Sequence, residues 1–112
     1  MKFALLGVGL LASACTDDGG PRLDAASPPA AARNAMITLT GRRLCGAHAD
    51  CSTAAGEVQI GLGSPAVRAV VVAYSDTRAQ IVIPPATPIG DTSLVVTVDD
   101  HPSNALAFEV LP

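Results

Sequence analysis

Three cysteines are the residues of this 112-residue chain whose spacing most directly implies chemistry. Cys45 and Cys51 enclose a short segment, residues 46–50, that also contains His48 and Asp50. Two thiols this close in sequence form a disulfide where the compartment is oxidising. The alternative is a metal site, because thiolate, imidazole and carboxylate groups are all metal ligands. The spacing matches no standard zinc pattern, so we predict a Cys45–Cys51 disulfide, with no metal and no cofactor.

The third cysteine, Cys15, follows a segment typical of an exported chain. Met1 and Lys2 supply a short positive start, residues 3–11 are mostly apolar, and small residues occupy positions 12–14. This order predicts a secretory signal, which is too short to span a bilayer as a stable helix. Export brings the chain into oxidising conditions, in agreement with the predicted disulfide.

Residues 11–15, Leu-Ala-Ser-Ala-Cys, resemble the lipobox of bacterial lipoproteins. In that family the Cys thiol is acylated and the chain is then cut just before it. The resemblance implies a signal peptide over residues 1–14. Residues 15–20 are then the lipidated Cys15 and a short linker. The chain would therefore be a membrane-anchored protein of the cell envelope or cell surface.

Four features of this segment and of the residues after it bear on the anchor. The lipoprotein family prefers Leu three places before the Cys, where this chain has Ala12. Ordinary cleavage after Ala14 also fits the small residues, and it would leave Cys15 as a lone thiol. Thr16, in place of Asp, favours the outer membrane by resemblance to the enterobacterial sorting rule. The five residues that follow Cys15, residues 16–20, span about 17 Å at full stretch, so a domain anchored at Cys15 would sit close to the bilayer.

Composition excludes several classes of function. Apolar residues make up 49% of the chain and charged residues 15%, so disorder over most of its length is not expected. The net charge is −3 and Lys2 is the only lysine, whereas nucleic-acid binding needs clustered Lys and Arg. Aromatic residues are 3% of the chain, too few for the stacking platforms that bases and sugars use. We therefore expect no nucleic-acid partner.

Candidate catalytic groups are few. Only His48 and His101 could act as a general base near neutral pH. Asp100 and Ser103 lie beside His101 in the sequence, but a catalytic triad needs geometry that converges from separate elements. A solvated turn accounts for these residues, so we predict no catalytic residue and no enzymatic activity.

Arg42 and Arg43 form a small basic spot next to the predicted disulfide, and with His48 they are the candidate interaction residues. The two arginines could contact a lipid phosphate or an acidic partner, or simply form a solvated strand end. Residues 99–100, both Asp, could hold Ca²⁺ together with Asp91. No EF-hand or similar spacing supports that site, and solvation in a turn accounts for the acidic pair.

Apolar residues alternate along the rest of the chain with period two, the pattern of half-buried β-strands. Pro, Gly, Asp and Ser separate these stretches, and no stretch repeats its apolar residues with the period of a helix. The predicted fold is all-β, a small β-sandwich of about seven strands. The inward-facing sets are Ile37 and Leu39; Val58, Ile60 and Leu62; Leu94, Val96 and Val98; and Leu106, Phe108 and Val110, with denser apolar runs at 69–74 and 80–83.

The sequence also predicts two turns and three exposed valines. Residues 75–77 predict a hairpin turn, and residues 100–104 predict the final turn. Val71, Val82 and Val95 are expected to be exposed. They would mark the first place to look for a partner if they formed one apolar patch.

The order of these features resembles the IPT/TIG domain, an immunoglobulin-like β-sandwich of the E-set kind. The likeness covers residues 21–112, with Leu44 where that family has Phe. Arg33 and Asn34 stand where the family has Gly, and Asn tolerates the left-handed backbone almost as well. The segment 45–51 is an elaboration of the pattern. The segments that carry the likeness are 21–28, 36–44, 58–61, 79–84 and 94–108.

The resemblance implies a non-catalytic protein-interaction or structural module, since IPT/TIG domains have no catalytic residues to carry over. The predicted protein is thus an exported, lipid-anchored envelope protein. It would dock onto another envelope protein through a sheet edge or through the Cys45–Cys51 segment. The alternative is a self-assembling surface or appendage subunit that uses its open sheet edges for strand addition.

Overall fold

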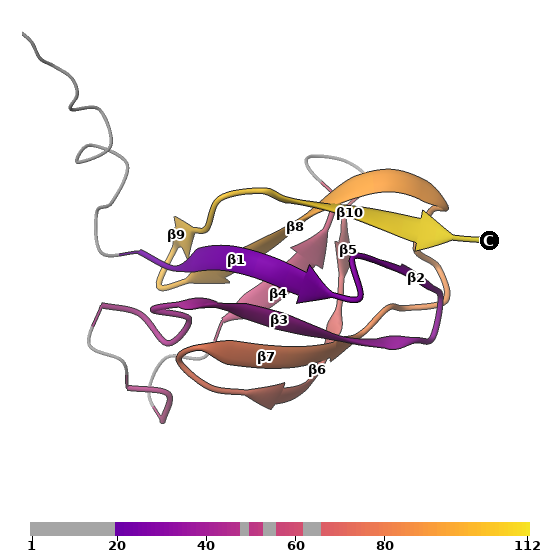
Figure 1. Ribbon diagram of the computed structural model, residues 1–112. Coiled ribbons are helices and arrows are strands. Elements are labelled where there is room, and N and C mark those ends of the chain that lie inside the picture. The colour runs from indigo at the N-terminus through magenta and orange to yellow at the C-terminus, as the bar shows by residue number, and fades with distance from the viewer. Residues whose placement is uncertain (1–19, 48–49, 53–55, 62–65) are drawn as a thin grey trace, which may run out of the picture.

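The described part of the chain folds into two β-sheets that face each other (Figure 1). The computed structural model describes residues 20–47, 50–52, 56–61 and 66–112. These residues form ten strands and no helix, and seven of the strands have four residues or more. They contain no helix that is long and apolar enough to cross a membrane. The predicted all-β, immunoglobulin-like sandwich of about seven main strands is confirmed.

The first sheet has four strands in the order β1-β3-β7-β6, each antiparallel to its neighbour. Its strands are β1 (Arg22–Ser27), β3 (Met36–Arg42), β7 (Arg78–Val82) and β6 (Val70–Tyr74). The predicted turn at residues 75–77 joins β6 to β7, and the Ser75 N–H donates to the Arg78 carbonyl at 2.7 Å to close it. This sheet therefore has two edges, β1 and β6.

The second sheet is ordered β2-β10-β8-β4-β5, with β9 paired to β8 beside that path. The pairing of β2 with β10 is parallel and the other pairings are antiparallel. The nine-residue β8 lies at the centre of this sheet. Its strands are β2 (Ala30–Ala32), β10 (Leu106–Leu111), β8 (Gly90–Val98), β4 (Glu57–Ile60), β5 (Val67–Arg68) and β9 (His101–Pro102).

Aliphatic side chains from both sheets fill the space between them. The alternation predicted from the sequence is confirmed in β3, β4, β7 and β10, where alternate residues are buried, whereas Leu23 is the only buried residue of the edge strand β1 and β6 has none. Leu106 is only partly buried against this core, and Leu62 lies outside the described residues. Full burial of one such side chain contributes about 1.5–3 kcal/mol. The larger core residues are Leu23, Ile37, Leu39, Leu44, Val58, Ile60, Ile81, Ile83, Leu94, Val96, Val98, Phe108 and Val110.

The expectation that Val95 is exposed is wrong, because only 8% of its surface is accessible. Its neighbours Leu94 and Val96 are buried as well, so β8 is apolar on both faces at this point. Central strands are covered more completely than edge strands, and the period-two pattern alone does not show that cover.

Left-handed backbone occurs at four described residues other than glycine, of which three, Asn34, Asp99 and Asp100, are short and polar and the fourth is Arg43. Asn34 has a φ of 69°, so it takes the conformation for which the IPT/TIG family uses Gly. Asp99 and Asp100 have φ values of 50° and 65°, which suits the tight turn between β8 and β9. The predicted turn at 100–104 is therefore partly wrong, since His101 and Pro102 already pair with β8.

One contact that the sequence did not reveal joins the first strand to the last loop. The Leu23 N–H donates to Oδ1 of Asn104 at 2.8 Å, and Nδ2 of Asn104 donates to the Leu23 carbonyl at 2.9 Å. The Asn104 side chain thus replaces a strand neighbour at this position of β1. It holds an edge strand to the opposite end of the chain.

Replacing Asn104 by Ala is expected to lower the free energy of unfolding by about 2 kcal/mol, because both backbone groups of Leu23 lose their partner. Urea unfolding followed by the fluorescence of the single tyrosine measures this loss, since the chain has no tryptophan. His101→Ala is the control: His101 is exposed in the neighbouring strand, so its loss is expected to stay within about 0.5 kcal/mol. Equal losses in the two variants would contradict the role of the Asn104 amide.

Candidate functional site

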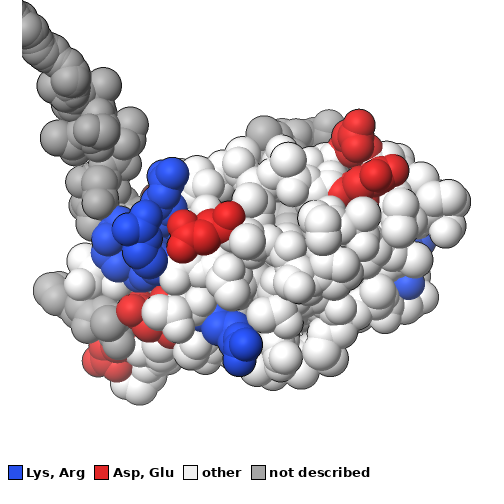
Figure 2. Space-filling model, in the orientation of Figure 1, with Lys and Arg blue, Asp and Glu red and all other residues white. Residues whose placement is uncertain are grey.

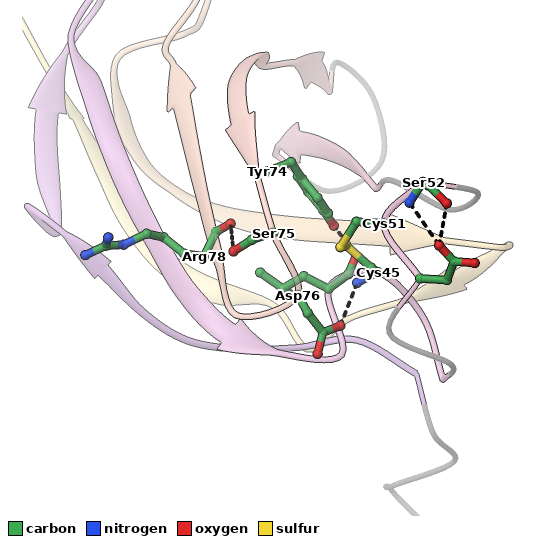
Figure 3. The surroundings of a disulfide bond; sticks show 9 residues. Cys45, Cys51, Ser52, Tyr74, Ser75, Asp76 and Arg78 are labelled. Carbon is green, nitrogen blue, oxygen red and sulfur yellow. Dashed lines mark hydrogen bonds between the residues drawn. A yellow bond between two sulfur atoms is a disulfide. The ribbon is translucent and has the colours of Figure 1, made fainter.

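Cys45 and Cys51 are joined by a disulfide, as predicted (Figure 3). Their Cα atoms are 4.8 Å apart, within the usual range for a disulfide. The bond takes up both thiols, so the alternative metal site of Cys45, His48, Asp50 and Cys51 loses its two thiolate ligands. We call the segment from Cys45 to Cys51 the disulfide loop.

The start of the disulfide loop is fastened to the β6–β7 hairpin by three hydrogen bonds. The Leu44 N–H donates to the Asp76 carbonyl at 2.9 Å, and the Cys45 N–H donates to Oδ1 of Asp76 at 3.2 Å. The Tyr74 hydroxyl donates to the Leu44 carbonyl. Leu44 and Cys45, where the chain enters the disulfide loop, are therefore fixed to the end of β6 and to the turn that follows it.

Tyr74 occupies a confined position between the loop and the core. A Cβ atom at Gly56 would overlap the Tyr74 hydroxyl, so only Gly leaves room for the ring at this point. Burial raises the pKa of Tyr74 to about 12. A hydrogen bond with the Gly56 backbone acts in the opposite direction, and the negative charge of Asp76 adds to the increase. The hydroxyl is therefore protonated at neutral pH, where it donates to the Leu44 carbonyl.

The other end of the disulfide loop is ordered by a carboxylate. Oδ1 of Asp50 accepts hydrogen bonds from the Ser52 N–H at 3.1 Å and from the Ser52 hydroxyl at 2.6 Å. This is a local Asx-type turn, in which a short acidic side chain replaces a backbone acceptor. His48, predicted as an interaction residue, lies outside the described residues.

The two predicted interaction arginines have different surroundings. Arg42 is exposed and pairs across the sheet with Arg22, while its guanidinium lies 4.0 Å from Asp24. Arg43 is half-buried and its Nε donates to the Gly20 carbonyl at 2.9 Å. Figure 2 shows basic side chains gathered near the start of the described chain, with acidic side chains close by. Arg43 therefore fastens the entering chain, and Arg42 belongs to a patch of mixed charge.

The remaining polar candidates do not converge on one site. The Ser103 hydroxyl donates to the Asn104 carbonyl and accepts from the Val96 N–H, each at 2.9 Å, so it supports the backbone between β9 and β10. Asp91 lies near the start of β8 and Asp99 follows its end, so the calcium ligand set considered from the sequence is separated by the length of that strand. Within the described residues, no group of three or more His, Cys, Asp and Glu side chains could hold a metal ion.

A shallow groove lies on the β6–β7 hairpin. Its volume is about 260 Å³, small for a ligand pocket. Its lining is about equally polar and apolar. The lining residues are Ala73, Tyr74, Ser75, Arg78 and Gln80.

Alkaline titration is expected to show the pKa of Tyr74 that burial has raised. The folded protein should ionise with a midpoint near the pKa of about 12, against about 10 in urea. Because the folded-state pKa is the higher one, this group stabilises the fold fully below pH of about 10 and loses that contribution as pH rises toward 12. Near-ultraviolet tyrosinate absorbance measures the midpoint, and Tyr74→Phe is the control that abolishes the signal. A midpoint near 10 in the folded chain would contradict the structure.

Comparison with protein-family models finds no match for this chain, and comparison with curated proteins finds none either. The likeness to IPT/TIG domains therefore rests on the residues quoted from the sequence. The sandwich itself is a property of the fold and does not by itself assign a function.

Proposed function

We propose that this protein is an exported, lipid-anchored protein of the cell envelope whose single sandwich domain is a non-catalytic interaction or structural module of IPT/TIG type. The observation that carries the proposal is the order of the chain: an apolar leader, a lipobox-like segment ending at Cys15, and a sandwich that begins almost at once. Ordinary cleavage that leaves Cys15 without lipid is the competing interpretation.

The contact between Arg43 and Gly20 supports a short tether. Because the Arg43 side chain binds the Gly20 carbonyl, the chain is already held by the domain at that residue. Only residues 16–19 separate Gly20 from Cys15. The distance from Cys15 to the domain is then at most about 17 Å. The domain would work against the bilayer surface, with the outer membrane favoured by Thr16.

The anchor would be lasting, since each buried CH₂ group contributes about 0.8 kcal/mol and lipoproteins carry more than one acyl chain. A basic patch would add little to it. Arg42 lies 4.0 Å from Asp24 and is in register with Arg22, and the linker itself contains Asp17 and Asp18. The lipid, rather than the charge of the domain, would therefore determine membrane attachment.

The use of the polar side chains supports binding rather than catalysis. The Tyr74 hydroxyl, Oδ1 of Asp76 and the Ser103 hydroxyl each make a hydrogen bond with the backbone. No catalytic residue is implied by the IPT/TIG likeness, and a docking role leaves the sheet edges and the disulfide loop as contact surfaces. Self-assembly through a sheet edge is the second candidate, favoured by the exposed valines of β6.

Cys15→Ser is expected to move the protein from the membrane fraction to the soluble envelope fraction and to abolish incorporation of a labelled fatty acid. The double variant Cys45→Ala/Cys51→Ala is the matched control, because it removes two other cysteines and should keep the label. Fractionation with fatty-acid labelling measures both. An unlabelled wild-type protein, or a Cys15→Ser variant that keeps the label, would overturn the proposal.

A further inference from the structure

The two sheets differ in the sign of their charge. The strands of the first sheet contain three arginines and one carboxylate, whereas those of the second sheet contain three carboxylates and one arginine. All of these residues are exposed. The first sheet therefore has a basic outer face and the second an acidic one. The charged residues are Arg22, Asp24, Arg42 and Arg78 in the first sheet, and Glu57, Arg68, Asp91 and Glu109 in the second.

The arginines of the first sheet are neighbours. Arg22 is in register with Arg42 across β1 and β3. Arg78 is in register with Thr40 on the other side of β3, so it lies diagonal to Arg42. Within these four strands only Asp24, 4.0 Å from Arg42, has the opposite charge. Like charges at facing positions of two strands repel each other, and an anion against this face relieves that repulsion.

The other carboxylates at this end of the domain lie outside the strands of the first sheet. Oδ1 of Asp50 and Oδ1 of Asp76 accept hydrogen bonds from the backbone next to the two ends of the disulfide loop. Asp99 and Asp100 form the turn between two strands of the second sheet. The basic charge therefore belongs to the outer face of the first sheet and not to this whole end of the domain.

The same face carries an exposed apolar row. Val82 pairs with Met36 on one side and with Val70 on the other, so the three side chains follow one another across β3, β7 and β6. Met36 is 51% exposed and Val70 is 56% exposed. The patch suggested from the sequence is therefore different: Val82 belongs to this row, but Val95 is buried in the other sheet. Basic and aliphatic side chains on one face suit the headgroup region of a bilayer.

The chain enters the domain at an edge of this basic sheet. The edge strand β1 begins two residues after Gly20, whose carbonyl is held by Arg43. Only residues 16–19 separate Gly20 from Cys15, so a lipid on Cys15 lies at most about 17 Å from the point of entry. Attraction between exposed charges extends over a Debye length, about 8 Å in physiological salt. The tether therefore keeps the first sheet close to the headgroups.

We propose that the outer face of the first sheet lies against anionic phospholipid headgroups, with Arg22, Arg42 and Arg78 on their phosphates, while the acidic second sheet faces away. This rests on the proposed lipid at Cys15, and it concerns the orientation of the domain rather than its attachment. A few arginines bind an anionic surface only weakly. An anchored domain meets that surface at a high effective concentration, so a weak attraction is sufficient to select one face.

The test couples residues 15–112 to vesicles through Cys15, the one thiol that the disulfide leaves free. A maleimide lipid makes this bond, so the result does not depend on native acylation. Vesicles of phosphatidylcholine are compared with vesicles of phosphatidylcholine and phosphatidylglycerol in equal parts. Phenylglyoxal modifies exposed arginines, and mass spectrometry of the peptides gives the rate at each of them.

Arg22, Arg42 and Arg78 are expected to react at least about fivefold more slowly on the vesicles that contain phosphatidylglycerol. Arg68 is the internal control, because it is exposed and close to a carboxylate, as Arg42 is, but lies in the second sheet. Its rate should be the same on both kinds of vesicle. High salt should abolish the protection, since it screens exposed charges.

A matched pair of variants tests the charge of the face. Arg22→Gln is expected to raise the rates at Arg42 and Arg78 on the anionic vesicles at least about twofold, because the face loses one of its charges. Arg68→Gln removes the same charge from the second sheet and should leave both rates low.

Equal rates at Arg22 on the two kinds of vesicle would overturn the inference, and so would equal protection of Arg68. Protection by inorganic phosphate on vesicles of phosphatidylcholine alone would assign the arginines to a free anion and would also reject the membrane. Failure of the proposed anchor is distinguishable from these results, because fatty-acid labelling of the native protein tests the anchor and the coupled chain tests the orientation.

Discussion

The sandwich depends on filling the space between two sheets with aliphatic side chains. Among the described residues Phe108 is the one aromatic side chain that is fully buried, so Leu, Ile, Val and Ala supply almost all of the core. A one-residue slip in strand register would turn a whole set of these side chains toward solvent. The hydrogen bonds of Asn104 to Leu23 and of Tyr74 to Leu44 act against such slips, because each fixes one segment against another.

Much of the fold could be predicted because half-buried strands leave a local pattern. Ile37, Leu39, Val58 and Val110 face the core as their alternation indicates. The features that the sequence pattern did not predict have physical causes. Alternation assigns each strand one exposed face, so it could not show that Val95 is buried beside Leu94 and Val96. Strands of two or three residues, such as β2 and β9, are too short to produce a pattern.

The surroundings of the disulfide loop were predictable only in part. The pairing of Cys45 with Cys51 followed from their closeness in sequence, and Asn34 fulfilled its expected left-handed turn. The contacts of Tyr74 with Leu44 and of Asp76 with Cys45 join residues about thirty positions apart, and no local spacing indicates them. The single tyrosine ahead of a Ser-Asp turn was the one available signal. The open edge at β6 likewise emerged only from the strand order.

The lipid that we propose at Cys15 and the disulfide between Cys45 and Cys51 can be tested in one experiment. The intact mass of the protein extracted from membranes, measured before and after reduction, tests both at once. We expect the mass of residues 15–112 plus acyl chains, increasing by about two hydrogen masses on reduction. A mass without acyl groups would contradict the anchor, and a mass that reduction leaves unchanged would contradict the disulfide.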